Sequence, residues 1–451
     1  MTEKRQLGPE GASPSLPESS DQSAGIGRVN GLAGLSFVSI AYMLNYVDRQ
    51  MLSVLIEPIK REIDISDSQI GLLTGTLFAV FYTLLSLPIA VLADRVRRIP
   101  VVSVACFAWS VFTGLSGLAA TFLQMAIARI GVAVGEAGGL SPSLSLISDY
   151  YPPRLRARAV GVMTAFAPIG VMIGAIGGGL IAEAYGWRMA FIIPAVVGVV
   201  VALAMFFLAP EPVRGAFDRP SLADQPRTTF VDAAKLFLKM PSLAWAALSG
   251  GLCAAITNAA LGWFPALMMR GYGASLQDVA LFYGPVVGLG LMCGAFASGW
   301  TVSALLGRSV RVFMLVPAGA MLFCAPLLYA ALSVESWQLM LAISFPLMIL
   351  VSATIPPIVA FSLEVAPPDA RSTTSALLMV IVNLIGIGIG PLMVGAASDF
   401  LRPSAGDDSL RLALLTTLFP TMLLATVTLY VASRYIGRDR VRAADGIPGP
   451  P

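Results

Sequence analysis

Long apolar segments alternate with short polar ones over most of this chain, and the pattern predicts an all-α membrane protein. Each apolar segment is long enough to cross a bilayer as a helix at about 1.5 Å per residue. The twelve predicted spans cover residues 31–56, 69–93, 99–119, 121–148, 159–182, 188–209, 242–269, 277–303, 312–333, 337–362, 373–397 and 411–433. We therefore expect two six-helix bundles, separated by one longer polar stretch.

The same pattern divides the chain into five regions. A tail rich in Pro, Gly, Ser and Glu is predicted to be disordered, and it lacks the apolar core and cleavage site of a signal peptide. The regions are the N-terminal tail (1–30), the N-terminal bundle (31–209), a linker (210–240), the C-terminal bundle (241–433) and a basic C-terminal tail (434–451).

The two predicted bundles repeat one another. Five matched pairs lie 215 positions apart, namely Pro142 with Pro357, Asp149 with Glu364, Pro152 with Pro367, Pro153 with Pro368, and Arg156 with Arg371. Glycines spaced four apart, which let helices approach closely, recur at Gly170, Gly174 and Gly178, at Gly290 and Gly294, and at Gly386 and Gly390. Paired halves of parallel orientation predict a transporter that works by alternating access around a site between the halves.

Composition supports a membrane protein and narrows its chemistry. The chain is 57% hydrophobic and 12% charged, with a mean hydropathy of +0.80, whereas soluble domains carry about 25% charged residues. It has no histidine, so proton chemistry would have to use carboxylates. The four cysteines lie in apolar segments without metal-ligand spacing, so we expect neither a metal site nor a cofactor.

The basic residues predict the orientation of the chain. One set of loops holds Arg95, Arg97, Arg98, Arg154, Arg156, Arg158, Arg308, Arg311 and Arg371, and the linker and both tails add more. The other set holds only Lys60, Arg61, Arg188, Arg270, Arg402 and Arg411. Because Lys and Arg concentrate on the cytoplasmic side, we expect both termini in the cytoplasm and the protein in the cell (inner) membrane.

Four charged residues lie at hydrocarbon depth in the N-terminal half. The first span carries Asp48 and Arg49, and the fourth carries Arg129 and Glu136. A charge near the bilayer centre costs at least about 2.5 kcal/mol and normally faces a bundle interior or a wet cavity. In the C-terminal half, the positions that match Arg129 and Glu136 hold uncharged residues, Ser344 and Val351. We therefore expect Asp48, Arg129 and Glu136 to serve something other than the fold, the alternative being a structural ion pair that holds helices together.

Their spacing suggests how protons and an anion could compete. Seven residues is nearly two helical turns, which places Arg129 and Glu136 on one face about 10 Å apart. Burial favours a neutral carboxyl group, and a neighbouring arginine favours the charged one. Our hypothesis is that ionised Glu136 neutralises Arg129, and that protonated Glu136 leaves Arg129 free to bind an anionic ligand. Asp48 would be a second proton carrier, or alternatively a neutral, hydrogen-bonded interior acid.

Other polar residues are candidates for binding substrate. Asn45 lies one turn before Asp48, Arg49 follows it, and the second half offers the uncharged Asn258 and Asn383. A cavity with charge on one wall and apolar or aromatic surface on the other suits an amphiphilic anion. The loop after the second span adds a candidate gating motif, Asp94, Arg95 and Arg98. There Asp94 would form an ion pair or cap a helix in one conformation only, although such arginines also serve simply as topology determinants.

The chain resembles the major facilitator superfamily, and within it the spinster branch. The resemblance rests on Asn45-Tyr46-Val47-Asp48-Arg49, Ile65-Ser66-Asp67-Ser68-Gln69-Ile70-Gly71-Leu72, Leu92-Ala93-Asp94-Arg95, Trp109-Ser110, and Arg129 with Gly135-Glu136-Ala137. Two glycines usual in the family's loop motif are replaced by Ala90 and Arg97. The resemblance implies a transporter of lipid-like molecules, such as lysophospholipids or sphingoid phosphates. It also implies proton coupling through Asp48, Arg129 and Glu136.

Two functional classes remain open at this point. The favoured one is a secondary transporter for an amphiphilic anion, with protons and membrane lipids as its other partners and no oligomeric partner. The alternative is a proton-linked carrier of a small polar organic anion or sugar acid. An enzyme is disfavoured because the chain lacks histidine, a metal cluster and a nucleophile–base set. No nucleotide-binding motif suggests ATP-driven transport, and nothing suggests nucleic-acid binding.

Overall fold

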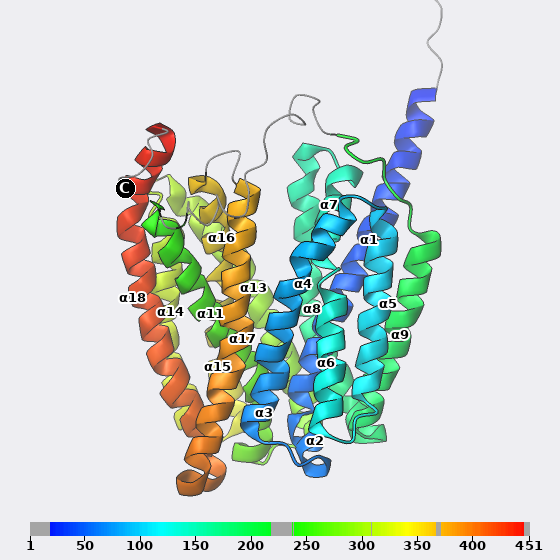
Figure 1. The fold of residues 1–451 in the computed structure, drawn as a ribbon. Helices are drawn as coiled ribbons and strands as arrows, with labels where there is room; N and C mark the ends of the chain where they lie inside the picture. The colour runs from blue at the N-terminus through cyan, green and yellow to red at the C-terminus, as the bar shows by residue number, and fades with distance from the viewer. Residues whose placement is uncertain (1–18, 218–236, 238, 308, 367–370, 446–451) are drawn as a thin grey trace, which may run out of the picture.

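The computed structural model describes residues 19–217, 237, 239–307, 309–366 and 371–445. Among them the regular structure is helical throughout (Figure 1). The predictions for residues 1–18, for most of the linker and for residues 446–451 lie outside the described residues. The helices form two groups, α1 to α9 and α11 to α18, which correspond to the two predicted bundles.

The first bundle contains spans one to six. Its elements are α1 (Ser19–Val54), α2 (Ile56–Glu62), α3 (Asp67–Gly71), η1 (Leu72–Thr76), α4 (Leu77–Ala93), α5 (Arg98–Ser116), α6 (Phe122–Glu136), α7 (Leu140–Tyr150), α8 (Pro153–Tyr185) and α9 (Trp187–Leu208). The second span is built from α3, η1 and α4, and the fourth from α6 and α7. Both are therefore interrupted helices.

The second bundle contains spans seven to twelve. Its elements are α11 (Pro241–Tyr272), α12 (Leu276–Asp278), η3 (Val279–Tyr283), α13 (Gly284–Leu306), α14 (Val312–Ser333), α15 (Trp337–Ser352), α16 (Ile355–Val365), α17 (Arg371–Ala405), η4 (Gly406–Asp408) and α18 (Ser409–Asp445). The eighth span is built from α12, η3 and α13, and the tenth from α15 and α16. The interruptions thus fall at equivalent spans of the two bundles.

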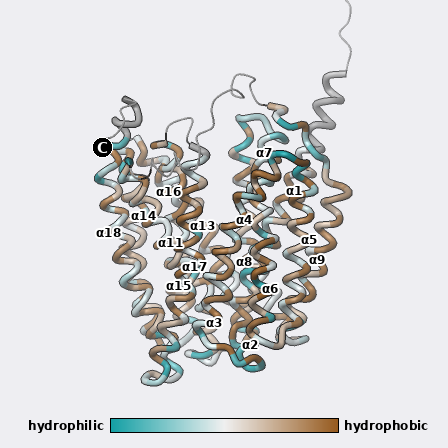
Figure 2. Tube along the Cα trace, viewed as in Figure 1, coloured by the Kyte–Doolittle hydropathy of each residue, from teal (hydrophilic) through white to brown (hydrophobic). Residues whose placement is uncertain are grey.

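The structure confirms the twelve predicted spans. Ten continuous segments of the described chain are long and apolar enough to cross a membrane, and the last of them, Thr373–Asp439, comprises both α17 and α18. Counting these two separately and adding α1 gives twelve. Figure 2 shows apolar residues along the middle of the helices and polar residues concentrated at the two ends. The chain is a multi-pass integral membrane protein.

One expectation about the ends of the chain was wrong. The helix α1 begins at Ser19, so residues 19–30 are helical and not disordered. At the other end α18 continues to Asp445, so part of the predicted C-terminal tail is also helical. The apolar pattern ends where the bilayer ends, but a helix does not have to. Once a helix is nucleated, each further residue adds one backbone hydrogen bond, so the spans extend beyond the hydrocarbon region.

The sequence repeat is also a structural repeat. Spans four and ten both break near their centre, between α6 and α7 and between α15 and α16. Pro142 and Pro357 lie in the first turns of α7 and α16, where the missing N–H removes no helical hydrogen bond. Spans two and eight each begin at a capping box, at Ser66 and Ser275, and continue into a π-helical turn.

The predicted glycine contacts are confirmed. A Cβ added at Gly174 of α8 would lie 2.5 Å from the carbonyl oxygen of Val47 in α1. A Cβ at Gly390 of α17 would lie 2.3 Å from the carbonyl oxygen of Ala255 in α11. Spans one and five, and spans seven and eleven, therefore pack backbone to backbone at glycine in both bundles.

The bundles meet through α3, η1 and α4 against α17, and through α8 against η3 and α13. In Figure 1 the bundles diverge towards the end that carries the N-terminal end of α1, the loop between α4 and α5, and the C-terminus; we call this the terminal end. The end that carries α2, α3 and η4 is the opposite end.

Candidate functional site

A cavity of about 440 Å³ lies between the two bundles. The predicted site residues that line it are Asn45, Arg49, Arg129, Glu136, Asn258 and Asn383. They come from α1 and α6 on one side and from α11 and α17 on the other. The structure therefore brings residues that are more than 300 positions apart to one chamber. Asp48 is absent from the lining.

Arg49 and Glu136 form an ion pair in the cavity wall. The Nε and Nη2 atoms of Arg49 donate to Oε2 of Glu136 at 2.9 and 2.6 Å. The guanidinium lies 4.3 Å from the ring centroid of Phe78, and the rings of Tyr46 and Tyr82 are also close. The Arg49 side chain is 26% exposed, whereas that of Glu136 is fully buried. Arg49 is therefore the cation that a ligand in the cavity can reach.

Arg129 and Asp48 form a second ion pair behind the first. Nη1 of Arg129 donates to Oδ2 of Asp48 at 2.8 Å, and the Thr113 hydroxyl donates to Oδ1 at 2.8 Å. Both charged side chains are less than 5% exposed. Asp48 borders only a small void between α1, α5 and α9, so it lies behind the wall that Arg129 presents to the cavity.

The predicted pairing of Arg129 with Glu136 was wrong, because the two arginines pair across helices. Along one helix the two residues are separated by about 10 Å of rise, too far for an ion pair. Asp48 and Arg49 are adjacent in α1 and so point about 100° apart, towards different partners on α6. Spacing within a single helix could therefore predict neither of the two ion pairs between α1 and α6.

Two polar atoms in this wall have no hydrogen-bond partner within the described part of the chain: Oε1 of Glu136 and Nε of Arg129. Both atoms are buried, and both residues line the cavity. Buried polar atoms in folded proteins are nearly always paired, and the exceptions are often functional. One acceptor and one donor are therefore available here to a proton, a water molecule or a ligand.

The other predicted binding residues, Asn45, Asn258 and Asn383, also line the cavity. Asn258 donates to the carbonyl oxygen of Ala254 at 2.8 Å, which leaves its own oxygen for other groups. Sequence reasoning missed Tyr42 and Tyr82, which also line the cavity. The hydroxyl groups of Tyr42 and Tyr46 lie 3.3 Å apart. A signal was available, because Tyr42, Tyr46 and Arg49 recur at helical spacing on one face of the first span.

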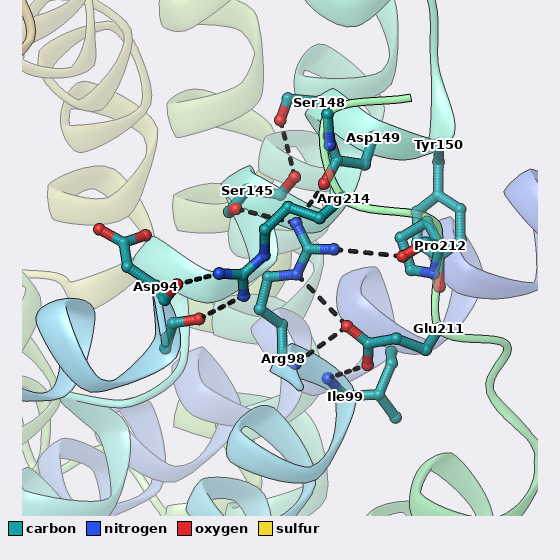
Figure 3. Close-up of polar contacts among 12 residues, drawn as sticks. Asp94, Arg98, Ile99, Ser145, Ser148, Asp149, Tyr150, Glu211, Pro212 and Arg214 are labelled. Carbon is teal, nitrogen blue, oxygen red and sulfur yellow. Dashed lines mark hydrogen bonds and ion pairs between the residues drawn. The ribbon is translucent and has the colours of Figure 1, made fainter. Parts of the chain in front are cut away.

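The predicted gating motif lies at the terminal end, where the start of the linker crosses it (Figure 3). Arg214 donates to the backbone carbonyl groups of Ala93 at 2.9 Å and Val96 at 2.8 Å, and also to that of Asp94. The carbonyl groups of Ala93 and Asp94 end α4, where a helix lacks intrahelical donors, and that of Val96 lies in the loop that follows. Arg214 therefore caps the helix that leads into the motif.

Arg98 and Glu211 complete this arrangement. The carboxylate of Glu211 accepts from the backbone N–H groups of Arg98 at 3.0 Å and Ile99 at 2.8 Å, which caps the start of α5. Arg98 is buried, pairs with Asp149 and lies 3.3 Å from Glu211. The sequence analysis missed Glu211 and Arg214, although both are charged residues directly after the sixth span.

The gating role of Asp94 and Arg95 stays a prediction. Both residues are exposed. In Figure 3 the Asp94 carboxylate points away from Arg214, which binds only its backbone. Among the described residues no hydrogen bond or ion pair reaches that carboxylate, so it is available to a partner in another conformation.

We expect Arg214→Ala to loosen the loop between α4 and α5. The variant removes the donors to three backbone carbonyl groups, and each lost bond of this type costs about 1 kcal/mol. Hydrogen–deuterium exchange should be roughly 100-fold faster at residues 94–98 than in the native protein, which corresponds to a loss of about 3 kcal/mol. Arg95→Ala, on the same loop, is the control. Equal protection in Arg214→Ala and the native chain would show that the linker does not hold this loop.

The comparisons with known proteins fit this architecture. A model of the Major Facilitator Superfamily matches residues 38–391. This chain belongs to that superfamily. It is a transporter and not an enzyme. It is 30% identical over 417 residues to an MFS-type efflux pump of Mycolicibacterium smegmatis, covering 91% of this chain and 95% of that protein.

Within the superfamily the chain is spinster-like. It is 27% identical over 423 residues to protein spinster homolog 1 of Xenopus tropicalis, covering 89% of this chain and 80% of that one. Its fold matches the crystal structure of a bacterial homolog of the human lysosomal transporter spinster, in an inward-facing and unoccupied conformation, with a TM-score of 0.79. That structure is 26% identical and covers 94% of this chain and 99% of its own.

Proposed function

We propose that this spinster-like protein is a proton-coupled secondary transporter of an amphiphilic anionic lipid, working by alternating access. One observation carries the proposal: the accessible cation of the cavity, Arg49, is neutralised by a buried carboxylate, Glu136, that still has a free oxygen. Protonation of that carboxylate removes the negative charge opposite Arg49. An anionic headgroup can then replace it as the partner of the guanidinium.

The second ion pair extends the same exchange. Arg129 contributes an unpartnered Nε atom to the cavity and is held by Asp48. If Asp48 takes up a proton, Arg129 loses its partner and can turn to the cavity. Asp48 therefore acts through Arg129, whereas Glu136 meets the cavity directly. Glu136 is the primary proton carrier of the proposal, Asp48 the secondary one, and Arg49 replaces Arg129 as the first contact for the anion.

The remaining lining supports an amphiphile. Beyond the charged wall, the cavity is bordered by apolar residues of the second bundle, including Leu261, Leu291, Met379 and Ile387. Asn45, Asn258 and Asn383 add uncharged polar groups to the lining. A headgroup at Arg49 would leave an acyl or sphingoid chain against this surface, where apolar burial contributes about 25 cal/mol per Å².

We further propose that the terminal end faces the cytoplasm, with residues 210–240 as a cytoplasmic linker between bundles 31–209 and 241–433. The basic loops favour this orientation in a cell membrane. The cavity lining continues towards the terminal end through Ser143 and Thr164, and the spinster homolog matched above was solved facing inward. The protein would then be a monomer in an inward-facing state.

Reconstitution in liposomes with a pH-sensitive dye tests this function. Lysophospholipids, sphingoid phosphates and small organic acids, sugar acids included, are added in turn. We expect proton movement with one of the lipid classes. Arg49→Gln should raise the half-saturating concentration about 10- to 100-fold, since a charge-assisted hydrogen bond contributes about 1.5–3 kcal/mol. Asn258→Ala, across the cavity, should change it far less.

A response to organic acids alone would replace the lipid proposal with the carrier of small polar anions. Substrate movement that is insensitive to a pH gradient would remove proton coupling. An unchanged half-saturating concentration in Arg49→Gln would show that Arg49 is not the anion contact.

A further inference from the structure

Three aromatic rings surround the guanidinium of Arg49, the cation that a ligand in the cavity can reach. Its central carbon, Cζ, lies 4.3 Å from the ring centroid of Phe78, 5.5 Å from that of Tyr82 and 5.7 Å from that of Tyr46. Tyr46 belongs to α1, and the other two residues belong to α4. A guanidinium within about 6 Å of a ring centroid is attracted to the electron-rich face of the ring. We call Tyr46, Phe78 and Tyr82 the aromatic cage.

The rings of the aromatic cage are held in place by their own neighbours. Phe78 and Tyr82 lie four residues apart on one face of α4, and their rings stack with 5.7 Å between the centroids and an interplanar angle of 18°. Tyr46 packs edge-on against Tyr42, with 5.2 Å between the centroids. Phe78 is only 2% exposed. The cage is therefore a packed surface and not a set of loose side chains.

Arg49 is the one intramembrane arginine with such a cage among the residues that the structure describes. The other, Arg129, is held by Asp48 and is only 2% exposed. Arg49 is 26% exposed, and Glu136 is its ionic partner. A long side chain that loses its partner in a wet cavity regains rotamer freedom. Arg49 therefore needs a second contact to stay in place if Glu136 loses its charge.

Few titratable groups face the Arg49 guanidinium. Glu136 faces it from α6, and two phenols of the aromatic cage face it from α1 and α4. Phenols stay neutral near pH 7. Asp48 and Arg129 pair with each other behind this ion pair. The described residues that α5, α7, α8, α11, α13, α15 and α17 contribute to the cavity lining are uncharged. A change of protonation at this wall therefore acts on Arg49 through Glu136.

We propose that the aromatic cage holds the Arg49 guanidinium in the cavity wall while Glu136 is neutral, and that Phe78 and Tyr82 are positioning residues for the anion contact. This inference rests on the proposed exchange of Glu136 for an anionic headgroup. The carboxylate and the rings attract the same cation, but only the carboxylate loses its negative charge on protonation. The incoming headgroup therefore meets a guanidinium that is already oriented, which reduces the entropy lost on binding.

Nuclear magnetic resonance of isotope-labelled arginine side chains tests the cage without any ligand. The Nε–H signal that disappears in Arg49→Gln is that of Arg49, and Glu136→Gln serves as the neutral form. In Glu136→Gln we expect the Arg49 signal to stay displaced by the ring currents of the cage. Adding Phe78→Leu should move it towards the signal of a free arginine. Phe191→Leu in the same background is the matched control, because Phe191 is a fully buried residue of α9 whose ring packs against Trp187.

Binding of dodecyl phosphate, a single-chain amphiphilic anion, to the protein in nanodiscs measures the consequence. In the Glu136→Gln background, Phe78→Leu should raise the dissociation constant about tenfold, within the range of desolvated cation–π contacts. Phe191→Leu should leave it unchanged. Tyr82→Leu is a second variant if Phe78→Leu does not fold, and Tyr82→Phe, which keeps the ring, should restore both the signal and the affinity.

The same Arg49 signal with and without Phe78 or Tyr82, or an equal change in Phe191→Leu, would overturn the cage. An unchanged dissociation constant alongside a changed signal would overturn its role in positioning. Failure of dodecyl phosphate to bind any form, the native protein included, would contradict the proposed anion site instead. The arginine signal would still decide for or against the cage in that case, because it is recorded without ligand.

Discussion

Glu136→Gln is expected to abolish transport driven by a pH gradient while the protein remains folded. Glutamine keeps an oxygen that can accept from Arg49, but it neither titrates nor neutralises the guanidinium. Anion binding would then no longer depend on a proton. Coupling between two ligands is typically worth about 1–3 kcal/mol, so the gradient-driven component should fall roughly 5- to 150-fold. Uptake into liposomes with and without an imposed gradient measures it directly.

The matched control for this experiment is Glu183→Gln. Glu183 is an exposed carboxylate of α8 in the same bundle and lies outside the cavity lining. The Glu183→Gln variant should keep gradient-driven uptake at the native level. The Glu136→Gln variant should still move substrate down the substrate's own concentration gradient. Native gradient-driven uptake by Glu136→Gln would remove Glu136 from the mechanism.

Asp48→Asn is expected to destabilise the first bundle more than any other substitution in the site. Removing one partner of a buried ion pair leaves the other charge unpaired, at a cost of about 3–5 kcal/mol. Here that charge is Arg129, whose side chain is only 2% exposed. For a bundle of this size the midpoint of thermal unfolding should fall by roughly 10 °C. Thermal unfolding in detergent, followed by circular dichroism, measures the change.

Two further variants separate charge from hydrogen bonding. Thr113→Val removes one donor to Asp48 and keeps the ion pair, so its cost should be about 1 kcal/mol. Asp48→Asn combined with Arg129→Gln removes both charges and should recover most of the lost stability, as buried ion pairs often can be replaced without loss. A native midpoint for Asp48→Asn alone would indicate that Asp48 is already neutral in the folded protein.

Substitutions of Glu136 and Asp48 are therefore expected to have different effects, although the sequence presents the two residues as equivalent intramembrane acids. Glu136 borders the cavity with one oxygen unpartnered, whereas both oxygens of Asp48 are bonded. Loss of Glu136 should change coupling more than stability, and loss of Asp48 should change stability first. The difference depends on which faces of the neighbouring helices meet these two acids, and the sequence of a single span does not contain that information.

The sequence by itself determined the class of the protein, the number of spans and the repeat between its halves. These follow from local properties: apolar length against bilayer thickness, proline tolerance at a helix start, and glycine where backbones must approach. It also offered six candidate residues that the structure places in the cavity lining, because an ionisable or polar group at hydrocarbon depth is costly and normally faces a bundle interior or a wet cavity. These are Asn45, Arg49, Arg129, Glu136, Asn258 and Asn383. The ends of α1 and α18 were misplaced because hydropathy marks the part of a helix that lies in the bilayer, and these helices extend beyond it.

Only the tertiary structure decided the partners. Arg49 pairs with Glu136 and Arg129 with Asp48 because α1 and α6 meet at one particular rotation, and Asp67 meets Arg270 because two bundles close at one end. Each pair joins residues 81 to 203 positions apart. A hydrogen-bonded ion pair needs its two charged groups within about 4 Å, so these charges find their partners only once packing brings the helices together.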